Sequence, residues 1–363
     1  MSEIFYKDEA NGFSPLIKRF EGKKVVFVSD FNTHKFAVEL MKEFKDSKNE
    51  DLYLNLKSLV PNEDVISAVK EGIKHSDLIM CVGSGSLNDV CKYVSKETSV
   101  PCATLATACS MDGYLSKGSA LMIKNKKVTW DCNAPIAVLV DTKVLKTAPR
   151  EMTAAGFGDI IGKYTALMDW HLGNILNGEE INEEAYSLME KALNDVVNSY
   201  DNLLKGDEDS IRKLINALLV AGTSMAICGN SRPASGSEHH ISHYLEMDFN
   251  NRGLEIPPHG VKVAMGTLVS IDLYNNLITL DIPHKEEITK LVKKLPSSQE
   301  VEKLLKGIGC PTRFSEIDVD EELLRRTLVN AYTVRDRFTI LTYYSNNHLW
   351  NEKLLNQLIK NHL

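Results

Sequence analysis

The chain has 363 residues, of which 43% are hydrophobic and 25% charged, values typical of a globular protein with room for two domains. Its net charge of −7 argues against a general nucleic-acid binder, which needs a basic surface, but leaves room for a local pocket that binds a small anion. The seven cysteines are odd in number and lack C-x-x-C spacing, so we expect reduced thiols in a cytoplasmic protein. We expect no secretory signal and no membrane span, since no apolar run approaches ~20 residues.

Residues 1–149 alternate between strand-like and helix-like stretches. Their short apolar, β-branched runs suit strands buried on both faces of a parallel sheet. The expected strands are 24–29, 51–59, 77–82, 100–107 and 135–140, with helices at 35–44 and 64–74 and a hairpin at 120–130, around Asn125-Lys126. This alternation predicts a doubly wound, Rossmann-like α/β domain.

Residues 150–363 have a different character, because the strand signal fades after about Ala148. Apolar residues then recur at helical spacing over 160–175, 188–200, 211–225 and 261–280, with Gly229 expected to end the third helix. We therefore predict an all-helical second domain, joined tightly to the first near Pro149, with a cleft between the two.

A glycine-rich turn, Gly83 to Asp89 (GSGSLND), follows the predicted strand 77–82. Glycines let a backbone approach phosphate closely, and the free N–H groups at a helix start bind the anion. The spacing is neither G-x-G-x-x-G nor a Walker A loop, so an ordinary strand-to-helix turn with Asp89 in the first helical turn remains equally open.

Two further polar segments follow predicted strands. Asp30, after 24–29, suits a hydrogen bond to the ribose of an adenine dinucleotide, although an Asp there is more often a cap or a turn residue. The loop from Thr107 to Ser116 is rich in small polar side chains and follows a strand, where open α/β sheets bind ligands. A capped loop without a ligand is the alternative.

The strongest chemical signal is a group of histidines in the second half. His239 and His243 are four residues apart and share one face of a helix, whereas His240 points about 100° away from His239. His259, between a proline and a glycine, can approach from a neighbouring element. Neutral imidazoles with one carboxylate suit a divalent metal with an open coordination position. A solvated polar helix start is the alternative.

Asp159 is the candidate carboxylate. It ends the motif Gly156-Phe157-Gly158-Asp159, which we expect to open a long helix. At that position an Asp is usually an N-cap or a first-turn residue, and this interpretation stays open beside the metal ligand.

Several of these motifs together resemble a known family. The turn Gly83 to Asp89, then Gly156 to Asp159 with Lys163-Tyr164-Thr165-Ala166, and finally His259-Gly260 occur in the order typical of the dehydroquinate synthase-like superfamily, which includes glycerol dehydrogenase and the iron-containing alcohol dehydrogenases. Within it, Ser231 to His239 (SRPASGSEH) and Asp159 to Trp170 are similar to the sn-glycerol-1-phosphate dehydrogenases.

The resemblance implies a metal site and a dinucleotide site. Asp159, His239 and His259 would hold the metal, and Asp159, His243 and Asp112 would contact substrate, with His243 or Asp112 supplying a proton through water. The implied contacts to NAD(H) or NADP(H) are Asp30, Gly83, Ser84, Gly85, Ser86, Leu87, Thr107, Ser110 and Ser116. Ser84 replaces the middle glycine of the family's loop, which matters only if this position needs a positive φ. Asp30 favours NADH over NADPH, because a carboxylate repels a 2′-phosphate.

The implied reaction is the reduction of dihydroxyacetone phosphate to sn-glycerol 1-phosphate, with zinc, nickel or ferrous iron as the Lewis acid. Arg232 is the candidate contact to the substrate phosphate, because a guanidinium matches phosphate geometry. The alternatives are a glycerol dehydrogenase acting on an unphosphorylated polyol, a dehydroquinate synthase-like cyclase, which is a lyase, and a non-catalytic sugar-phosphate sensor. A homodimer or higher homo-oligomer is the default expectation.

Overall fold

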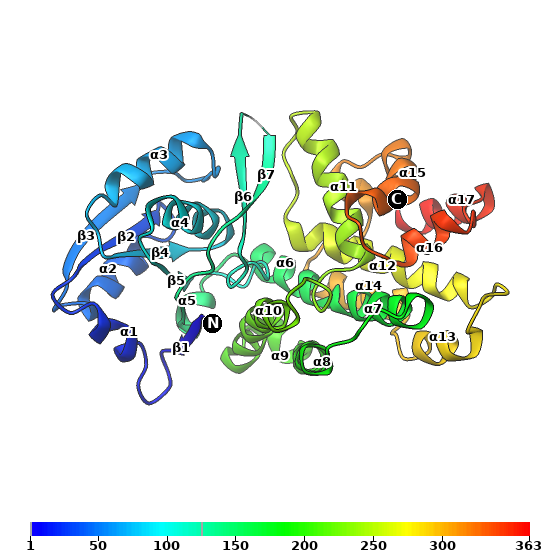
Figure 1. The fold of residues 1–363 in the computed structure, drawn as a ribbon, viewed down its shortest axis with the longest axis horizontal. Coiled ribbons are helices and arrows are strands. Elements are labelled where there is room, and N and C mark those ends of the chain that lie inside the picture. Colours follow the sequence, from blue (N-terminus) through cyan, green and yellow to red (C-terminus); the bar gives the residue numbers. More distant parts are fainter. Residues whose placement is uncertain (1, 125) are drawn as a thin grey trace. The chain divides into compact units, whose positions relative to one another are not determined.

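The computed structural model describes residues 2–124 and 126–363, and the chain forms two compact units, residues 1–149 and 150–363 (Figure 1). The first unit consists of β1 (Glu3–Tyr6), α1 (Ser14–Arg19), β2 (Lys24–Asp30), α2 (His34–Glu43), β3 (Lys48–Leu54), α3 (Glu63–Gly72), β4 (Leu78–Gly83), α4 (Gly85–Thr98), β5 (Cys102–Ala106), β6 (Gly118–Ile123), β7 (Lys126–Asp131), β8 (Ala137–Val140) and α5 (Thr142–Leu145).

Six parallel strands form the central sheet of the first unit, in the order β1-β8-β5-β4-β2-β3. The predicted doubly wound α/β domain is therefore confirmed. Strand β3 begins and ends earlier than the predicted 51–59, and its largely exposed side chains, typical of an edge strand, weaken its sequence signal. Strand β1 was not predicted, because it has only four residues and none of them is fully buried.

Helices cover both faces of this sheet, as its apolar runs require. Along β2, Val26 and Val28 pack against α3 and α4, whereas Val25 and Phe27 pack against α1 and α2 on the opposite side. Because side chains alternate between the two faces, β2, β4 and β5 each contribute to both hydrophobic cores.

The predicted hairpin is confirmed as the antiparallel pair β6–β7, while Asn125 lies outside the described residues. The hairpin is tied to the rest of the unit through its first strand. The Asp89 carboxylate of α4 accepts a hydrogen bond from the Ala120 amide (3.1 Å), and the Met122 amide donates to the Pro61 carbonyl (2.9 Å).

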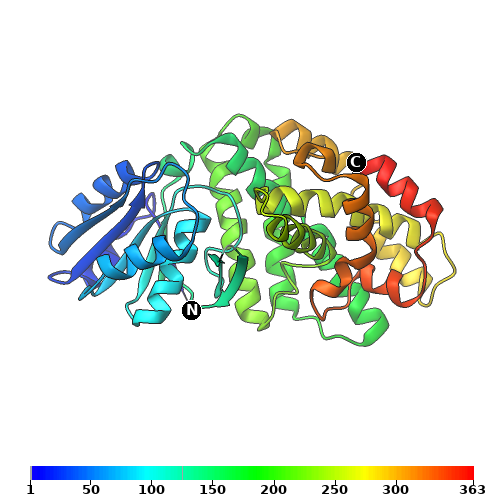
Figure 2. The same ribbon diagram turned by 90° about the horizontal axis from the view of Figure 1, so that it is seen from above.

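The second unit is helical, as predicted: residues 150–363, all of which the structure describes, contain helices and loops but no strand (Figure 2). Its helices are α6 (Arg150–Ile161), α7 (Lys163–Asn177), α8 (Glu183–Asn198), α9 (Tyr200–Leu204), α10 (Glu208–Cys228), α11 (Ser237–Asn251), α12 (His259–Leu277), α13 (Lys285–Val292), α14 (Ser298–Ile308), α15 (Glu321–Asn330), α16 (Ile340–Asn346) and α17 (Glu352–His362), with the short 3₁₀ helices η1 (Phe314–Ile317) and η2 (Ala331–Val334).

Helix α10 is long and apolar enough, by length and composition alone, to cross a membrane. The expectation that no apolar run approaches that length is therefore wrong. However, half of its most apolar window is buried, and the helix packs against α8 and α6. The predicted stop at Gly229 is confirmed, with φ +74° at the C-cap. We conclude that α10 is a core helix of the second unit.

All seven cysteines are free thiols, and six of them are buried; the seventh, Cys228, is partly exposed. Burial raises the pKa of the Cys109 and Cys310 thiols to about 12, which suppresses the reactive thiolate.

We expect the native protein to react with about one equivalent of a small thiol reagent near neutral pH, because only Cys228 is accessible. A Cys228→Ser variant should then show no fast phase, whereas several fast thiols in the native protein would contradict this packing.

Candidate active site

Three helices of the second unit each contribute one candidate metal ligand. Asp159 lies near the end of α6, so the prediction that Gly156 to Asp159 opens a helix is wrong, and Asp159 is neither an N-cap nor a first-turn residue. His239 lies in the first turn of α11, and His259 is the first residue of α12. These positions are 80 and 20 residues apart in sequence (239 − 159 and 259 − 239), so only tertiary packing brings them together.

Glycines next to two of the ligands allow this packing. A Cβ on Gly260 would lie 1.8 Å from the Ala155 carbonyl oxygen, and a Cβ on Gly158 would lie 2.6 Å from the Gly260 carbonyl oxygen. Helices α6 and α12 therefore meet backbone to backbone at this point. Because Asp159 follows Gly158 and His259 precedes Gly260, the contact holds the two ligands side by side.

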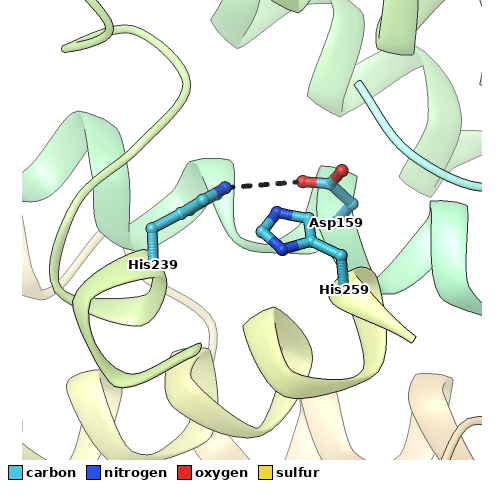
Figure 3. Close-up of side chains that lie close together, drawn as sticks. All are labelled: Asp159, His239 and His259. Atoms are coloured by element: carbon cyan, nitrogen blue, oxygen red, sulfur yellow. Dashed lines mark ion pairs between the residues drawn. The ribbon is translucent and has the colours of Figure 1, made fainter. Parts of the chain in front are cut away.

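One ligand atom from each of Asp159, His239 and His259 lies within 4.8 Å of the other two. Figure 3 shows the three side chains converging, with His239 Nε2 3.8 Å from Asp159 Oδ1. Asp159 and His239 are buried and His259 is partly exposed. A carboxylate with two imidazoles fits a divalent ion such as zinc, nickel or ferrous iron and leaves coordination positions open.

Neighbouring carboxylates orient both imidazoles. His239 Nδ1 lies 2.7 Å from Glu238 Oε1, which leaves Nε2 facing Asp159, and His259 Nδ1 lies 3.3 Å from Glu246 Oε1. Such partners are typical of metal-binding histidines, because they fix the ring and its tautomer. Burial, with Lys163 nearby, holds the pKa of His239 well below its usual value. His239 is therefore a neutral imidazole, the form that binds metals.

Lys163 belongs to this centre, although no sequence argument assigned it a role. Its fully buried ammonium donates to Asp159 Oδ1 (2.8 Å) and to the Ala234 carbonyl (3.0 Å). A carboxylate has lone pairs for several partners, so Asp159 accepts this bond and still offers oxygen to a metal. The sequence signal for this contact was the spacing of four residues between Asp159 and Lys163, which corresponds to one helical turn even across the α6–α7 junction.

His243 lies beside the three ligands, with its ring centroid 5.6 Å from that of His259 and 6.0 Å from that of His239. Its Nδ1 is 3.1 Å from Glu246 Oε2, and its Nε2 is 3.2 Å from an Arg335 nitrogen. Glu246 thus bridges His243 and His259, a role that sequence reasoning missed although Glu246 is three residues from His243. Burial lowers the pKa of His243 to about 4, so this imidazole is neutral near pH 7.

Arg232 is almost fully buried and already paired. Its Nε and Nη2 bind the two oxygens of Glu179, and its Nη1 donates to the Phe338 carbonyl (2.7 Å). The two parallel guanidinium donors that were expected to bind phosphate are therefore already paired with a carboxylate. This geometry lends no support to the predicted contact between Arg232 and substrate.

Asp169 of α7 anchors the helix that carries His239 and His243. Its buried carboxylate accepts hydrogen bonds from the Ser237 amide (2.6 Å), the Ile340 amide (2.7 Å) and the Tyr274 hydroxyl (2.6 Å). It thereby links the start of α11 to α12 and α16.

An Asp169→Ala variant is expected to lose about 3–5 kcal/mol of unfolding free energy, because three buried donors lose their acceptor. Tyr274→Phe, which removes one of the donors, should cost only about 1 kcal/mol. Burial raises the pKa of Asp169 above its unfolded value, so folding disfavours the ionised form. The loss in Asp169→Ala should therefore shrink as pH rises from the ordinary carboxyl range through the raised value. Urea titrations at acidic and neutral pH test this, and equal losses in both variants would refute it.

The predicted nucleotide contacts lie in the first unit, at the carboxyl edge of its sheet. The chain passes from β2 outward to β3 and then to β4 on the other side of β2, so the topological switch point lies between β2 and β4. Helix α4 begins at Gly85, directly after β4, and the Thr107 amide donates to the Gly83 carbonyl (3.2 Å). Ser84 has φ −114°, so its replacement of a glycine introduces no strain.

The other predicted nucleotide contacts differ in how they are held. Asp30 Oδ1 accepts hydrogen bonds from the amides of Asn32 (2.9 Å) and Thr33 (3.0 Å), so it acts as a turn residue, and its ribose contact stays a prediction. The Leu87 side chain is buried, which limits any contact to its backbone. Ser116 Oγ is engaged with the Gly113 carbonyl (3.1 Å).

Lys92 shapes the loop that contains Ser110, Asp112 and Ser116. Its fully buried ammonium donates to the Gly113 (3.0 Å), Ser116 (3.3 Å) and Gly118 (2.5 Å) carbonyls and pairs with Asp89. Sequence reasoning missed this lysine, which lies one turn after Asp89 on α4. The loop conformation is thus held from the helix that starts at the glycine-rich turn.

Comparison with known proteins agrees with this arrangement. Residues 5–149 match the family described as iron-containing alcohol dehydrogenase. The chain is 33% identical to the glycerol-1-phosphate dehydrogenase [NAD(P)+] of Bacillus licheniformis, over 89% of this chain and 83% of that protein. It is 30% identical to the enzyme of the same name from Bacillus subtilis, over 95% and 91%.

Solved structures share the whole fold. The glycerol dehydrogenase of Schizosaccharomyces pombe superposes with a TM-score of 0.71 at 18% identity, covering 99% of this chain and 88% of that one. A 1,3-propanediol oxidoreductase gives 0.71 at 16% identity, with 99% and 97% covered. With relatives that are 30% or more identical over most of both chains, the chain belongs to the glycerol-1-phosphate dehydrogenase family of the iron-containing alcohol dehydrogenases.

Proposed function

We propose that this protein is a metal-dependent NAD(P)H oxidoreductase that reduces dihydroxyacetone phosphate to sn-glycerol 1-phosphate in the cytoplasm. The observation that carries the proposal is the convergence of Asp159, His239 and His259 from three helices. The names of the relatives, which specify glycerol 1-phosphate and NAD(P)+, supply the substrate and the cofactor.

Asp159, His239 and His259 would hold one divalent ion, and Asp159 would also border the substrate. When bound, the ion supplies Lewis-acid stabilisation of the substrate's developing alkoxide, worth several kcal/mol. Glu238 and Glu246 keep the two imidazoles in the orientation that this requires.

The proton for the new hydroxyl group would come from His243 or from Asp112, through water. His243 lies beside His259 and is neutral near pH 7, so in this role it would pass on a proton that it takes up from water during the reaction. In the first unit, the amides of Gly83, Ser84, Gly85, Ser86 and Leu87 would bind the pyrophosphate at the start of α4. Asp30, Thr107, Ser110 and Ser116 are the other proposed nucleotide contacts. A homodimer is the proposed assembly.

The deciding experiment compares dihydroxyacetone phosphate with dihydroxyacetone, using NADH and NADPH and protein loaded with zinc, nickel or ferrous iron. We expect stoichiometric cofactor oxidation with the phosphorylated substrate and sn-glycerol 1-phosphate as the product. A glycerol dehydrogenase would prefer dihydroxyacetone, a cyclase would show no net cofactor oxidation, and a sensor would bind without turnover. Any of these three results would reject the proposal.

A further inference from the structure

The loop between η2 and α16 carries two arginines and lies against the segment that precedes α11. Arg337 Nη1 donates to the Ser235 carbonyl (2.5 Å), and its Nη2 donates to Ser231 Oγ (2.6 Å). One residue further along, the Phe338 carbonyl accepts from Arg232. These bonds hold the loop at the start of the helix that carries two of the candidate-site histidines.

Arg335 contacts His243, one of the imidazoles of the candidate site. Its guanidinium lies 3.2 Å from His243 Nε2, and the His243 ring is 5.6 Å from the His259 ring. The side chain is exposed, so a ligand can approach it. In dihydroxyacetone phosphate the phosphate is esterified to the carbon next to the carbonyl carbon, so a phosphate-binding cation is expected in the neighbourhood of the metal ligands.

Arg337 supplies a second positive charge, and no carboxylate among the described residues pairs with Arg337 itself. It forms no ion pair within residues 2–124 and 126–363, and its two hydrogen bonds leave three of its five N–H donors unused. Burial, with the charges of Arg232 and Arg335, lowers the pKa of Arg337 to about 10. Arg232 differs, because Glu179 balances its charge. A phosphate dianion beside Arg337 would offset the repulsion between its positive charge and those of the neighbouring arginines.

Buried polar atoms without a partner occur within, and just after, the segment that Arg337 contacts. The Ser235 hydroxyl and both ring nitrogens of His240 are buried and have no hydrogen-bond partner among the described residues. Buried polar groups nearly always have a partner, so a polar ligand or its water is expected here. Ser235 is the residue whose carbonyl accepts from Arg337, and His240 lies in the first turn of α11, which this segment precedes.

We infer that Arg335 and Arg337, rather than Arg232, recognise the phosphate ester of the substrate. The inference rests on the proposed function and names the side chains that would separate phosphorylated from unphosphorylated substrates. A guanidinium pairs with phosphate through two parallel N–H bonds, and a shared dianion accommodates both arginines.

The test is the steady-state kinetics of the metal-loaded enzyme with dihydroxyacetone phosphate and with dihydroxyacetone. For Arg335→Ala we expect KM for the phosphorylated substrate to rise about tenfold or more, because a charge-assisted hydrogen-bonded pair is lost. KM for dihydroxyacetone should change less than about twofold, since this substrate has no phosphate. Inhibition by inorganic phosphate should weaken by a similar factor. Arg337→Lys keeps the charge but loses the fork, so a smaller change in the same direction is expected.

Arg325→Ala is the matched control, because Arg325 pairs with Glu352 and Asn356 on the surface of the same unit. Thermal melting of each variant separates binding from misfolding, and the exposed Arg335 alone suffices if the Arg337 variant does not fold. An unchanged substrate preference in Arg335→Ala overturns the inference while the proposed function stands. A wild-type enzyme that does not prefer dihydroxyacetone phosphate over dihydroxyacetone overturns both.

Discussion

Replacing His259 by alanine is expected to release the metal and to lower kcat/KM for dihydroxyacetone phosphate by a factor of about 1,000 or more, since Lewis-acid stabilisation of several kcal/mol is lost. Asp159 and His239 would remain as two ligands, too few for a tight divalent site. The fold should persist, because His259 is partly exposed at the first position of α12. Metal content by elemental analysis, measured beside the kinetics, checks both parts.

His171→Gln is the control for this experiment, because the His171 ring contacts only Tyr186 among the ring contacts of the described residues and lies on α7, which carries none of the three ligands. It should retain both metal and turnover. Removing the metal from the wild-type enzyme with a chelator should abolish turnover, and adding it back should restore it. If the metal-stripped enzyme still turns over at the original rate, the proposed role of Asp159, His239 and His259 is wrong.

Gly260→Ala is the second change with a large expected effect, because a single methyl group would separate α6 from α12. The new Cβ would lie 1.8 Å from the Ala155 carbonyl oxygen and 2.6 Å from its carbon, both backbone atoms that cannot move away as a side chain could. We expect a loss of about 3 kcal/mol or more in unfolding free energy, the upper range for overpacking. The metal should also be lost, because Asp159 and His259 would no longer lie side by side.

Gly118→Ala is a suitable comparison for this variant. A Cβ on Gly118 would meet the nearest atom, a Thr129 methyl carbon, at 3.5 Å, an ordinary contact, so its stability should change by less than about 1 kcal/mol. Denaturant titration and metal analysis of both variants form the test. If Gly260→Ala is as stable as Gly118→Ala and keeps its metal, the backbone contact between α6 and α12 does not position the ligands.

The architecture of both units and the three candidate metal ligands were accessible from the sequence, since they depend on local patterns and residue types. The β-branched runs of β2, β4, β5 and β8 mark strands buried on two faces, and apolar residues at helical spacing mark the second unit. His239 and His243 are one turn apart, so any helix brings them to one face. His259 and Asp159 were candidates from their residue types alone, because imidazoles with one carboxylate suit a divalent metal, and the family motifs implied the same three ligands.

The sequence did not show which residues from distant segments of the chain contact one another. Arg232 was assigned to phosphate because it is near His239 in sequence, but the structure pairs it with Glu179, 53 residues away. Arg335 lies 92 residues from His243 and carried no pattern that would point to it. Helical periodicity indicates which face of a helix is buried, but not which residue of another helix it meets. The meeting of Asp159 with His259 was decided by the backbone contact at Gly158 and Gly260, since only residues without a Cβ allow two helices to approach so closely.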